Sequence, residues 1–530
     1  MTALGRASLP DIAAGALAVA FALVCVRFAW QPVLASFADD SASYLVMAQV
    51  FSPWQPASQP IAEAFVREAF YPPLFPALLG LVGAGDDIGL AHAVSALLLA
   101  CALPLTYMLG VRWLGDRRAA LAAVIVTALL PSLWIHVKGI LSEPLFCLLF
   151  LAILVLLETE KRGPMLLALA LAALALTRTV GVIVLAAHAL HALTQPATDS
   201  RERAKRAWPA FAGIAAYGVW VLLRPAETAD VNVRFMVERG HAIFASPDML
   251  AALGAGMARQ AKAFAEAWIG ALMVFWVPGR MVPVAIASAL GALSLAGLLA
   301  RLGTGKLDAW MTAAYLLTFL LWPFYDQMTR FLFPVLPVLV LYGFWAIGAA
   351  LRRSGRPAIA ASVVLTLVFA SLSMPALAFI HQRARSPEPH AQMTDWYRTP
   401  DLDKARARAQ VHLDLLADMQ AIERLTRKHD RVMWVAPSYI ALLANRRGVP
   451  APEAGLSLDR YRAAVGEKSP DYVFLSLYHP RDTLSDRAWQ VGVAAVAKSG
   501  TVVHLNTRPD GMVSSLLVKL RGEDLVARGE

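Results

Sequence analysis

Long apolar runs separated by polar loops fill the first three quarters of the chain. A membrane-spanning helix needs about 20 mostly apolar residues. The pattern predicts a polytopic α-helical membrane protein with eleven spans, at residues 11–35, 88–111, 118–136, 142–158, 164–178, 180–195, 207–223, 281–300, 309–325, 331–351 and 358–380. The first run exceeds the apolar region of a secretory signal and lacks a small-residue cleavage site, so we expect an uncleaved span.

Basic residues concentrate in alternate loops between these spans. The loops rich in Lys and Arg are short: RWLGDRR (112–118), EKRG (160–163), RERAKR (201–206), RLGTGK (301–306) and LRRSGR (351–356). The positive-inside rule assigns them to the cytoplasm. The N-terminus is then cytoplasmic, and the long loops 36–87 and 224–280 lie outside, together with the C-terminal region.

One apolar stretch, YPPLFPALLGLVGAG (71–85), does not fit this alternation as a span. It is short and interrupted by prolines, and a full crossing here would reverse the side of every later loop. We therefore expect a juxtamembrane or re-entrant element, which is tolerated where it lines a protein cavity.

The sequence changes character at about residue 385, where charge rises and apolar runs shorten. Strand-like segments lie at 431–437, 471–478, 501–506 and 514–520, and helix-like segments at 401–428 and 483–498. Strands that alternate with helices predict a small α/β domain with a mixed sheet. We therefore divide the chain into a membrane domain, 1–384, and an extracytoplasmic α/β domain, 385–530.

Composition supports the membrane assignment. The 530 residues are 58% hydrophobic and 16% charged, whereas soluble domains carry about 25% charged residues. The basic residues behind the net charge of +10 cluster in short loops, which indicates topology rather than a nucleic-acid-binding surface. The cysteines, Cys25, Cys101 and Cys147, lie in apolar runs, so we expect buried unpaired thiols.

Two adjacent carboxylates, Asp39 and Asp40, follow the first predicted span in SFADDSASYLVMA (36–48). A carboxylate close to hydrocarbon is costly, so it either marks the polar end of the span or serves a function. These aspartates open a loop of about fifty residues rich in aromatics and prolines, and long connections tend to be functional or disordered. This length favours the functional alternative.

Glu143 stands at the predicted outer end of a later span. Ser142 before it and Pro144 after it are typical of a helix start, where a glutamate is favourable for the helix dipole. The alternative is a second carboxylate that faces Asp40 and shares a divalent metal cation with it or alters its pKa.

Basic side chains occur at the same predicted outer ends. Arg178 and Arg330 either extend to the interface or bind an anionic group at membrane depth. Phosphate is the best match for the guanidinium fork. His136 and Lys138 lie in the loop that carries Glu143.

These features resemble the GT-C superfamily of integral-membrane glycosyltransferases, especially the bacterial relatives of protein O-mannosyltransferases and of lipid A aminoarabinose transferases. The resemblance covers about residues 10–380. It rests on five stretches in order: DDSASYLVMA (39–48), YPPLFPALLGL (71–81), SEPLFCLLFLAILVLLE (142–158), ALALTRTVGVIVL (173–185) and RFLFPVLPVLVL (330–341).

The resemblance implies that an aspartate of the first external loop, four residues before a tyrosine, is the catalytic base. Asp40 precedes Tyr44 by four residues, so Asp40 is the first candidate and Asp39 the second. Glu143 matches the place of the family's second acidic residue. With Asp40 it forms the expected metal site, if a divalent cation is used.

The lipid A branch of the family has a lysine before the Pro-Pro of the first loop, and Tyr71 replaces it here. This departure weakens the expectation of a lipid A acceptor. It shifts the expected contacts with the donor to other residues of the outer mouth. The full set of predicted substrate-binding residues is Arg330, Arg178, Lys138, Tyr44, Tyr71 and His136.

The implied reaction is inverting transfer of a sugar from a polyprenyl-phosphate donor to an acceptor hydroxyl of a glycolipid, glycan or protein. It would occur at the outer face of the bacterial cytoplasmic membrane, within the lipid bilayer and without nucleic acid. Two alternatives remain: a transporter or flippase of lipid-linked or small solutes, and a non-catalytic envelope assembly protein. The sequence has neither GxxxxGK[ST] nor GxSxG, and no intramembrane carboxylate chain of the kind proton-coupled transporters use.

Overall fold

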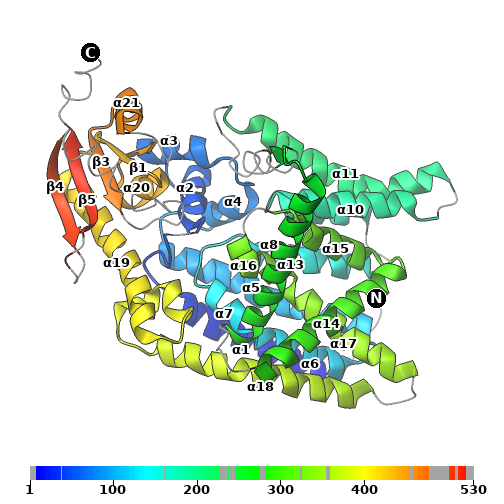
Figure 1. Cartoon of the computed structure of the whole chain (residues 1–530). Helices are drawn as coiled ribbons and strands as arrows, with labels where there is room; N and C mark the ends of the chain where they lie inside the picture. Colours follow the sequence, from blue (N-terminus) through cyan, green and yellow to red (C-terminus); the bar gives the residue numbers. More distant parts are fainter. Residues whose placement is uncertain are drawn as a thin grey trace.

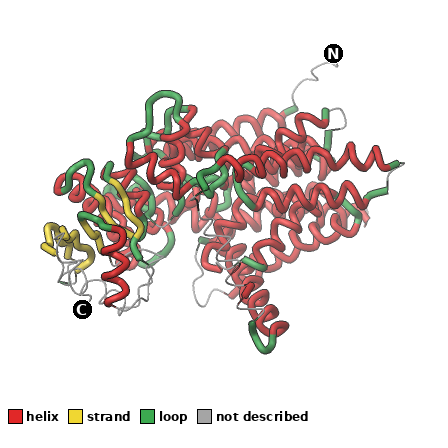
Figure 2. The backbone as a smooth tube through the Cα atoms, turned by 90° about the horizontal axis from the view of Figure 1, so that it is seen from above, coloured by secondary structure: helices red, strands yellow, loops and turns green. Residues whose placement is uncertain are grey.

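A helical membrane part and a small sheet-containing part make up the molecule (Figures 1 and 2). The structure is a computed structural model. It describes residues 8–37, 39–159, 163–196, 199–226, 228, 237, 240–241, 245–274, 281–322, 325–353, 358–452, 458–476, 500–507, 511 and 513–520.

A helix occupies each of the eleven ranges predicted as spans. These helices are α1 (Leu9–Ala29), α5 (Ile88–Leu114), α6 (Arg117–Ala128), α8 (Glu143–Leu157), α9 (Pro164–Ala175), α10 (Val180–Thr194), α11 (Ser200–Leu223), α14 (Met281–Gly303), α15 (Leu307–Leu320), α17 (Leu336–Arg353) and α18 (Ala358–Ala384). Among the described residues, six helices are long and apolar enough to cross a membrane, with α17 extended by the preceding short helices. The chain is thus a multi-pass membrane protein, and the number of eleven spans stays a prediction.

The turn between α5 and α6 shows how the sequence ends one helix and starts the next. Gly115 adopts a left-handed backbone conformation with φ of 69°, which a residue without a side chain tolerates best. Asp116 then accepts hydrogen bonds from the amides of Arg118 and Ala119, at 2.7 and 3.0 Å. This side chain caps two amides that the first turn of α6 leaves unpaired.

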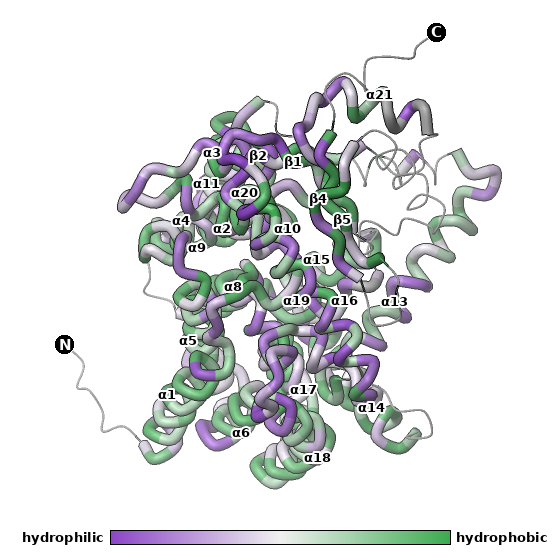
Figure 3. The backbone as a smooth tube through the Cα atoms, turned by 90° about the vertical axis from the view of Figure 1, so that its left-hand side faces the viewer, coloured by the Kyte–Doolittle hydropathy of each residue, from purple (hydrophilic) through white to green (hydrophobic). Residues whose placement is uncertain are grey.

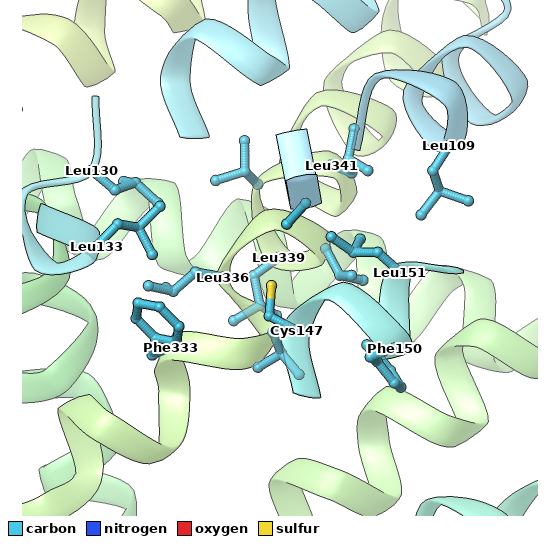
Figure 4. Packing of buried hydrophobic residues seen from close by; sticks show 14 of the residues in the cluster. Leu109, Leu130, Leu133, Cys147, Phe150, Leu151, Phe333, Leu336, Leu339 and Leu341 are labelled. Atoms are coloured by element: carbon cyan, nitrogen blue, oxygen red, sulfur yellow. The ribbon is translucent and has the colours of Figure 1, made fainter. Parts of the chain in front are cut away.

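The interior of the membrane part is filled by aliphatic and aromatic side chains of α5, α8 and α17 (Figure 4). Cys147 lies within this cluster and Cys25 is also buried, as predicted, and the cysteines are free. The prediction for Cys101 is wrong, because its side chain is exposed. An apolar residue of a membrane helix can face lipid instead of protein, and the sequence alone does not separate the two.

The first loop that was predicted to be external, residues 36–87, is largely helical. It contains α2 (Ser41–Phe51), α3 (Gln59–Glu68) and α4 (Leu74–Leu81). α4 has only eight residues, too few to cross a bilayer, in agreement with the interpretation of 71–85 as a juxtamembrane or re-entrant element. A β-carbon at Gly80 would lie 2.5 Å from the carbonyl oxygen of Ala48, so α4 packs closely against α2.

The second predicted external loop contains a helix that the sequence did not predict, α13 (Met249–Met273). Short helical segments accompany the longer ones elsewhere in the membrane part. They are α7 (Pro131–His136), η1 (Tyr325–Gln327), α16 (Met328–Leu332) and η2 (Phe333–Val335).

The C-terminal part begins after α18. Its helical elements are η3 (Pro389–Gln392), η4 (Thr394–Tyr397), α19 (Leu402–Leu425), α20 (Pro437–Ala444) and α21 (Leu458–Lys468). Its strands are β1 (Arg431–Trp434), β2 (Arg447–Pro450), β3 (Tyr472–Ser476), β4 (Gly500–Thr507) and β5 (Val513–Leu520). The order in the sheet is β2-β1-β3-β5-β4.

The sheet is mixed, as predicted. β1 runs parallel to β2 and β3, whereas β5 is antiparallel to β3 and β4. All four predicted strands are present. β2 was missed because its sequence, RGVP, contains glycine and proline, which are depleted in strands. The helix predicted at 483–498 lies outside the described residues.

The C-terminal part packs against the loop at residues 36–87. α2, α3 and α4 lie between the sheet region and the membrane helices in Figure 1. In Figure 3, α1, α14 and α18 are mainly hydrophobic, whereas α3 and the region around β2 are more hydrophilic. The hydrophilic C-terminal part and the first loop therefore share one side of the molecule.

A close helix crossing yields a stability test. A β-carbon at Gly297 in α14 would lie 2.2 Å from the carbonyl oxygen of Tyr342 in α17, and membrane helices use small residues for such approaches. We expect Gly297→Ala to destabilise the protein by about 1–3 kcal/mol, measured as thermal unfolding in detergent. Gly15→Ala on α1, where the β-carbon meets nothing within 4 Å, is the control. Equal unfolding temperatures of the two variants would contradict this account of the crossing.

Candidate functional site

Four segments that are distant in the sequence meet at one end of the membrane part. Asp40 is the residue before α2, and Glu143 is the first residue of α8. Arg178 lies in the short turn between α9 and α10, and Arg330 lies in α16. Each residue stands at or near a helix end, where the polar side chain is compatible with the apolar helix beside it.

Arg330 bridges the two carboxylates. Its Nη2 donates to Oδ2 of Asp40 at 2.5 Å, and its Nε donates to Oε1 of Glu143. Arg178 approaches the same Oε1 of Glu143 through Nη1 at 2.6 Å. The result is a chain of alternating charges, Asp40–Arg330–Glu143–Arg178, which we call the ion chain.

Two tyrosines and a serine extend the ion chain. The hydroxyl of Tyr71 donates to Oδ1 of Asp40 at 2.6 Å. Burial and the neighbouring Asp40 raise the pKa of Tyr71 well above its ordinary value, so the phenol stays a hydrogen-bond donor. Tyr44 reaches the hydroxyl of Ser142 at 2.8 Å, and Nη1 of Arg178 donates to the same hydroxyl at 3.2 Å.

The ion chain combines buried and accessible members. The side chain of Glu143 is 1% exposed, and its Oε2 has no hydrogen-bond partner among the described residues. The side chain of Asp40 is 19% exposed. Asp40 is therefore the carboxylate that an incoming group can reach. Glu143 is buried and holds Arg330 and Arg178 in place.

Asp39 does not belong to the ion chain. Its Oδ1 accepts a hydrogen bond from the backbone amide of Ser41 at 2.9 Å, which is the local pattern of an Asx turn. Its carbonyl oxygen accepts from the hydroxyl of Tyr439 at 3.0 Å. Burial raises the pKa of Asp39. The structure therefore places Asp40 toward the arginines and Asp39 toward its own backbone.

The two predicted basic residues of the loop before α8 also lie apart from the ion chain. Nδ1–H of His136 donates to the carbonyl oxygen of Ser132 at 2.8 Å. Lys138 donates to the carbonyl oxygen of Phe28 at 3.2 Å, and its Nζ lies 4.6 Å from the centre of the Phe28 ring. Burial lowers the pKa of Lys138 to about 8.

The carboxylates do not fit a shared divalent cation in this arrangement. Asp40 and Glu143 are joined by Arg330, whose positive charge occupies the place between them and would repel a metal ion. No group of three or more His, Cys, Asp or Glu side chains suited to a metal occurs in the described part of the chain. A divalent cation elsewhere at the site stays an untested prediction.

Sequence reasoning missed residues that the fold brings to this site. His412 and Tyr439, both from the C-terminal part, contact the turn that carries Asp39 and Asp40. Arg67 in α3 does not contact the ion chain in the described structure, but it lies four residues before Tyr71, and its Nε and Nη2 are buried with no hydrogen-bond partner among the described residues. A basic residue close to the Pro-Pro of the first loop was a usable signal for Arg67. No local signal marks the other two.

No protein-family model matches the chain, and no curated protein matches its sequence. Solved structures do resemble it. ArnT from Cupriavidus metallidurans bound to undecaprenyl phosphate is 12% identical, with a TM-score of 0.50, over 96% of this chain and 97% of that one. An oligosaccharyltransferase from Archaeoglobus fulgidus, tethered with an acceptor peptide, is 11% identical, with a TM-score of 0.47, over 95% and 74%. The first likeness shows the fold: the chain shares the fold of ArnT, which is the GT-C fold that the sequence predicted.

The ion chain gives a second stability test. Glu143→Gln removes a carboxylate that is 1% exposed and the shared counter-charge of two mostly buried guanidinium groups, and breaking a buried ion pair in this way costs about 3–5 kcal/mol. We expect Glu143→Gln to unfold at a clearly lower temperature than Asp40→Asn, because Asp40 is partly exposed. Circular dichroism during heating in detergent measures both. A Glu143→Gln variant as stable as the wild type would show that the ion chain does not hold these segments together.

Proposed function

We propose that this protein is an inverting glycosyltransferase that moves a sugar from a polyprenyl-phosphate donor to an acceptor hydroxyl. The observation that carries the proposal is the pairing of a reachable carboxylate, Asp40, with a guanidinium group at the end of a membrane helix bundle. A base next to a phosphate-binding cation is the combination that this reaction needs. The GT-C fold is consistent with it.

Donor binding comes first in the proposed mechanism. In the structure Asp40 is held by Arg330 and Tyr71, so its proton-accepting oxygens are occupied. The phosphate of the donor is an anion that competes with Asp40 for Arg330, and guanidinium binds phosphate well. When Arg330 turns to the phosphate, the positive charge beside Asp40 moves away and Asp40 becomes a stronger base.

Sugar transfer then follows in one displacement. Asp40 accepts the proton of the acceptor hydroxyl as its oxygen attacks the anomeric carbon. The new carbon–oxygen bond forms on the face opposite the bond to phosphate, which breaks. The polyprenyl phosphate leaves with the bonding electron pair, and Arg330 stabilises its developing charge. Inversion at the anomeric carbon is the stereochemical consequence.

The other cations have separate roles in this proposal. Arg178 is already paired with Glu143, so it holds that carboxylate in place when Arg330 turns. Arg67 is the described cation in the first loop whose buried nitrogens lack partners, and we assign it to the donor as a second phosphate contact. It substitutes in charge for the lysine that Tyr71 replaces.

The proposed location follows from the charge of the loops. We place the N-terminus in the cytoplasm and the C-terminal part in the periplasm of a bacterial inner membrane, because basic loops stay in the cytoplasm. The site then faces the side where nucleotide sugars are absent and where lipid-linked donors serve instead. The acceptor is a glycolipid, a glycan or a protein exposed on that face.

Replacement of Asp40 tests the proposed function directly. A strain that lacks this protein is complemented with wild type, Asp40→Asn or Asp39→Asn, and its envelope glycolipids, polysaccharides and glycoproteins are compared by mass spectrometry. We expect a sugar that is present with wild type and missing with Asp40→Asn, since loss of a general base costs about 10²–10⁴ in rate. Thermal unfolding of the purified variant verifies that it folds.

Asp39→Asn is the matched control, because an asparagine oxygen can still accept the amide of Ser41. We expect this variant to retain the modification. A fully active Asp40→Asn variant would remove Asp40 as the base. If no envelope component differs between the strains with and without the protein, the proposed function itself is wrong.

Replacement of Arg330 tests the donor site. We expect Arg330→Gln to weaken binding of undecaprenyl phosphate by about tenfold or more, because a charge-assisted contact contributes about 1.5–3 kcal/mol. Binding is measured with the purified protein in detergent. Arg118→Gln, an exposed position at the start of α6 on the basic-loop side, is the control. Unchanged affinity in Arg330→Gln would exclude Arg330 from the phosphate site.

A further inference from the structure

We propose that the C-terminal domain positions the catalytic base, with Tyr439 and His412 as its positioning residues. The inference rests on the proposed role of Asp40 and deepens it. It concerns the turn at residues 35–39, which is part of the connection between α1 and α2; residues 35–37 and 39, which the structure describes, form no helix or strand. A turn of this kind needs outside contacts to hold one conformation.

Tyr439 contacts the turn through both its ring and its hydroxyl. The hydroxyl donates to the carbonyl oxygen of Asp39 at 3.0 Å, one residue before the base. The ring stacks on Phe37 with centres 4.7 Å apart and an angle of 24° between the planes. Tyr439 comes from α20, so this contact joins the C-terminal domain to the backbone beside Asp40.

His412 holds the same turn from α19. The backbone amide of Phe37 donates to Nδ1 of His412 at 3.2 Å, which requires that the proton of the neutral ring be on Nε2. Nε2 lies 3.5 Å from Oδ2 of Asp395. Burial raises the pKa of Asp395, but the bond from His412 and the charge of Arg398 outweigh this and lower it to about 2. Asp395 is therefore an ionised acceptor that orients the imidazole.

A third contact also holds the turn at residues 35–39. The amide of Thr394 in η4 donates to the carbonyl oxygen of Ala35 at 2.9 Å. Three separate elements of the C-terminal region thus bind the turn at Ala35, Phe37 and Asp39 within five residues. On the other side of Asp40, its carbonyl oxygen accepts the amide of Tyr44 in the first turn of α2.

The C-terminal domain also contacts α3, the helix that precedes Tyr71. Ser438, next to Tyr439, donates to Glu68 at the end of α3. Arg447 in β2 pairs with Glu63 of the same helix at 2.9 Å. The amide of Tyr71 in turn donates to the carbonyl oxygen of Glu68 at 3.1 Å. The C-terminal domain therefore holds both the turn before Asp40 and the segment that carries Tyr71, and a shift of about 1 Å in such a group can cost 10²-fold in rate.

Removal of one hydroxyl tests this inference in the full-length protein. Tyr439→Phe keeps the ring on Phe37 and loses the bond to Asp39. We expect amide hydrogen exchange in the peptide covering residues 35–41 to rise about five- to tenfold, since one hydrogen bond contributes about that factor. The transfer rate in membranes should fall by about tenfold or more, with the affinity for undecaprenyl phosphate unchanged. Tyr107→Phe is the control, because its hydroxyl also donates to an oxygen, Oδ1 of Asp11 at 2.7 Å, and α5 is not one of the elements that bind the turn.

A second pair of variants separates positioning from folding. Asparagine can place an oxygen close to the position of Nδ1, so His412→Asn should retain more protection and activity than His412→Leu. Wild-type exchange and transfer in Tyr439→Phe would overturn the inference, as would equal effects of Tyr439→Phe and Tyr107→Phe or of the two His412 variants. The exchange result does not depend on activity, so it stays informative if Asp40→Asn proves active and the proposed function fails.

Discussion

The guanidinium group of Arg330 lies between two carboxylates that come from distant parts of the chain. Moving such charges out of water is costly unless each one is compensated. Positive and negative side chains alternate here, and Arg178 is a second cation that pairs with Glu143. Because the charges cancel, the turn after α1, the start of α8, the α9–α10 turn and α16 can pack together at the end of an apolar helix bundle.

The same compensation connects structure to the proposed chemistry. A base that is paired with a cation and a tyrosine hydroxyl in the resting state has little tendency to activate water. A phosphate that takes over Arg330 would free Asp40 only when a donor is present. The C-terminal domain adds the second constraint, since its contacts with residues 35–39 define where the freed carboxylate stands. The charge of Arg330 and the contacts of the C-terminal domain thus both act on Asp40.

The sequence predicted the helices and most candidate residues, but not how the residues pair. Apolar runs of helical length are local patterns, and so are short apolar segments that alternate with helical ones. The helices and four of the strands could therefore be predicted. The Arg330 contacts join residues separated by 187 and 290 positions, which no local pattern encodes. Lys138 and His136 are basic, as a phosphate-binding residue needs to be, but their side chains donate hydrogen bonds to backbone carbonyl oxygens and do not join the ion chain. The role of Tyr439 could not be predicted from the sequence, because its hydroxyl binds a backbone oxygen.

An experimental structure of the full-length protein with undecaprenyl phosphate bound would reveal whether Arg330 exchanges Asp40 for the phosphate. We expect the phosphate within hydrogen-bonding distance of Arg330, with the 2.5 Å contact between Arg330 and Asp40 broken and the Arg178–Glu143 pair intact. A phosphate bound elsewhere, with Arg330 still bridging Asp40 and Glu143, would contradict this expectation.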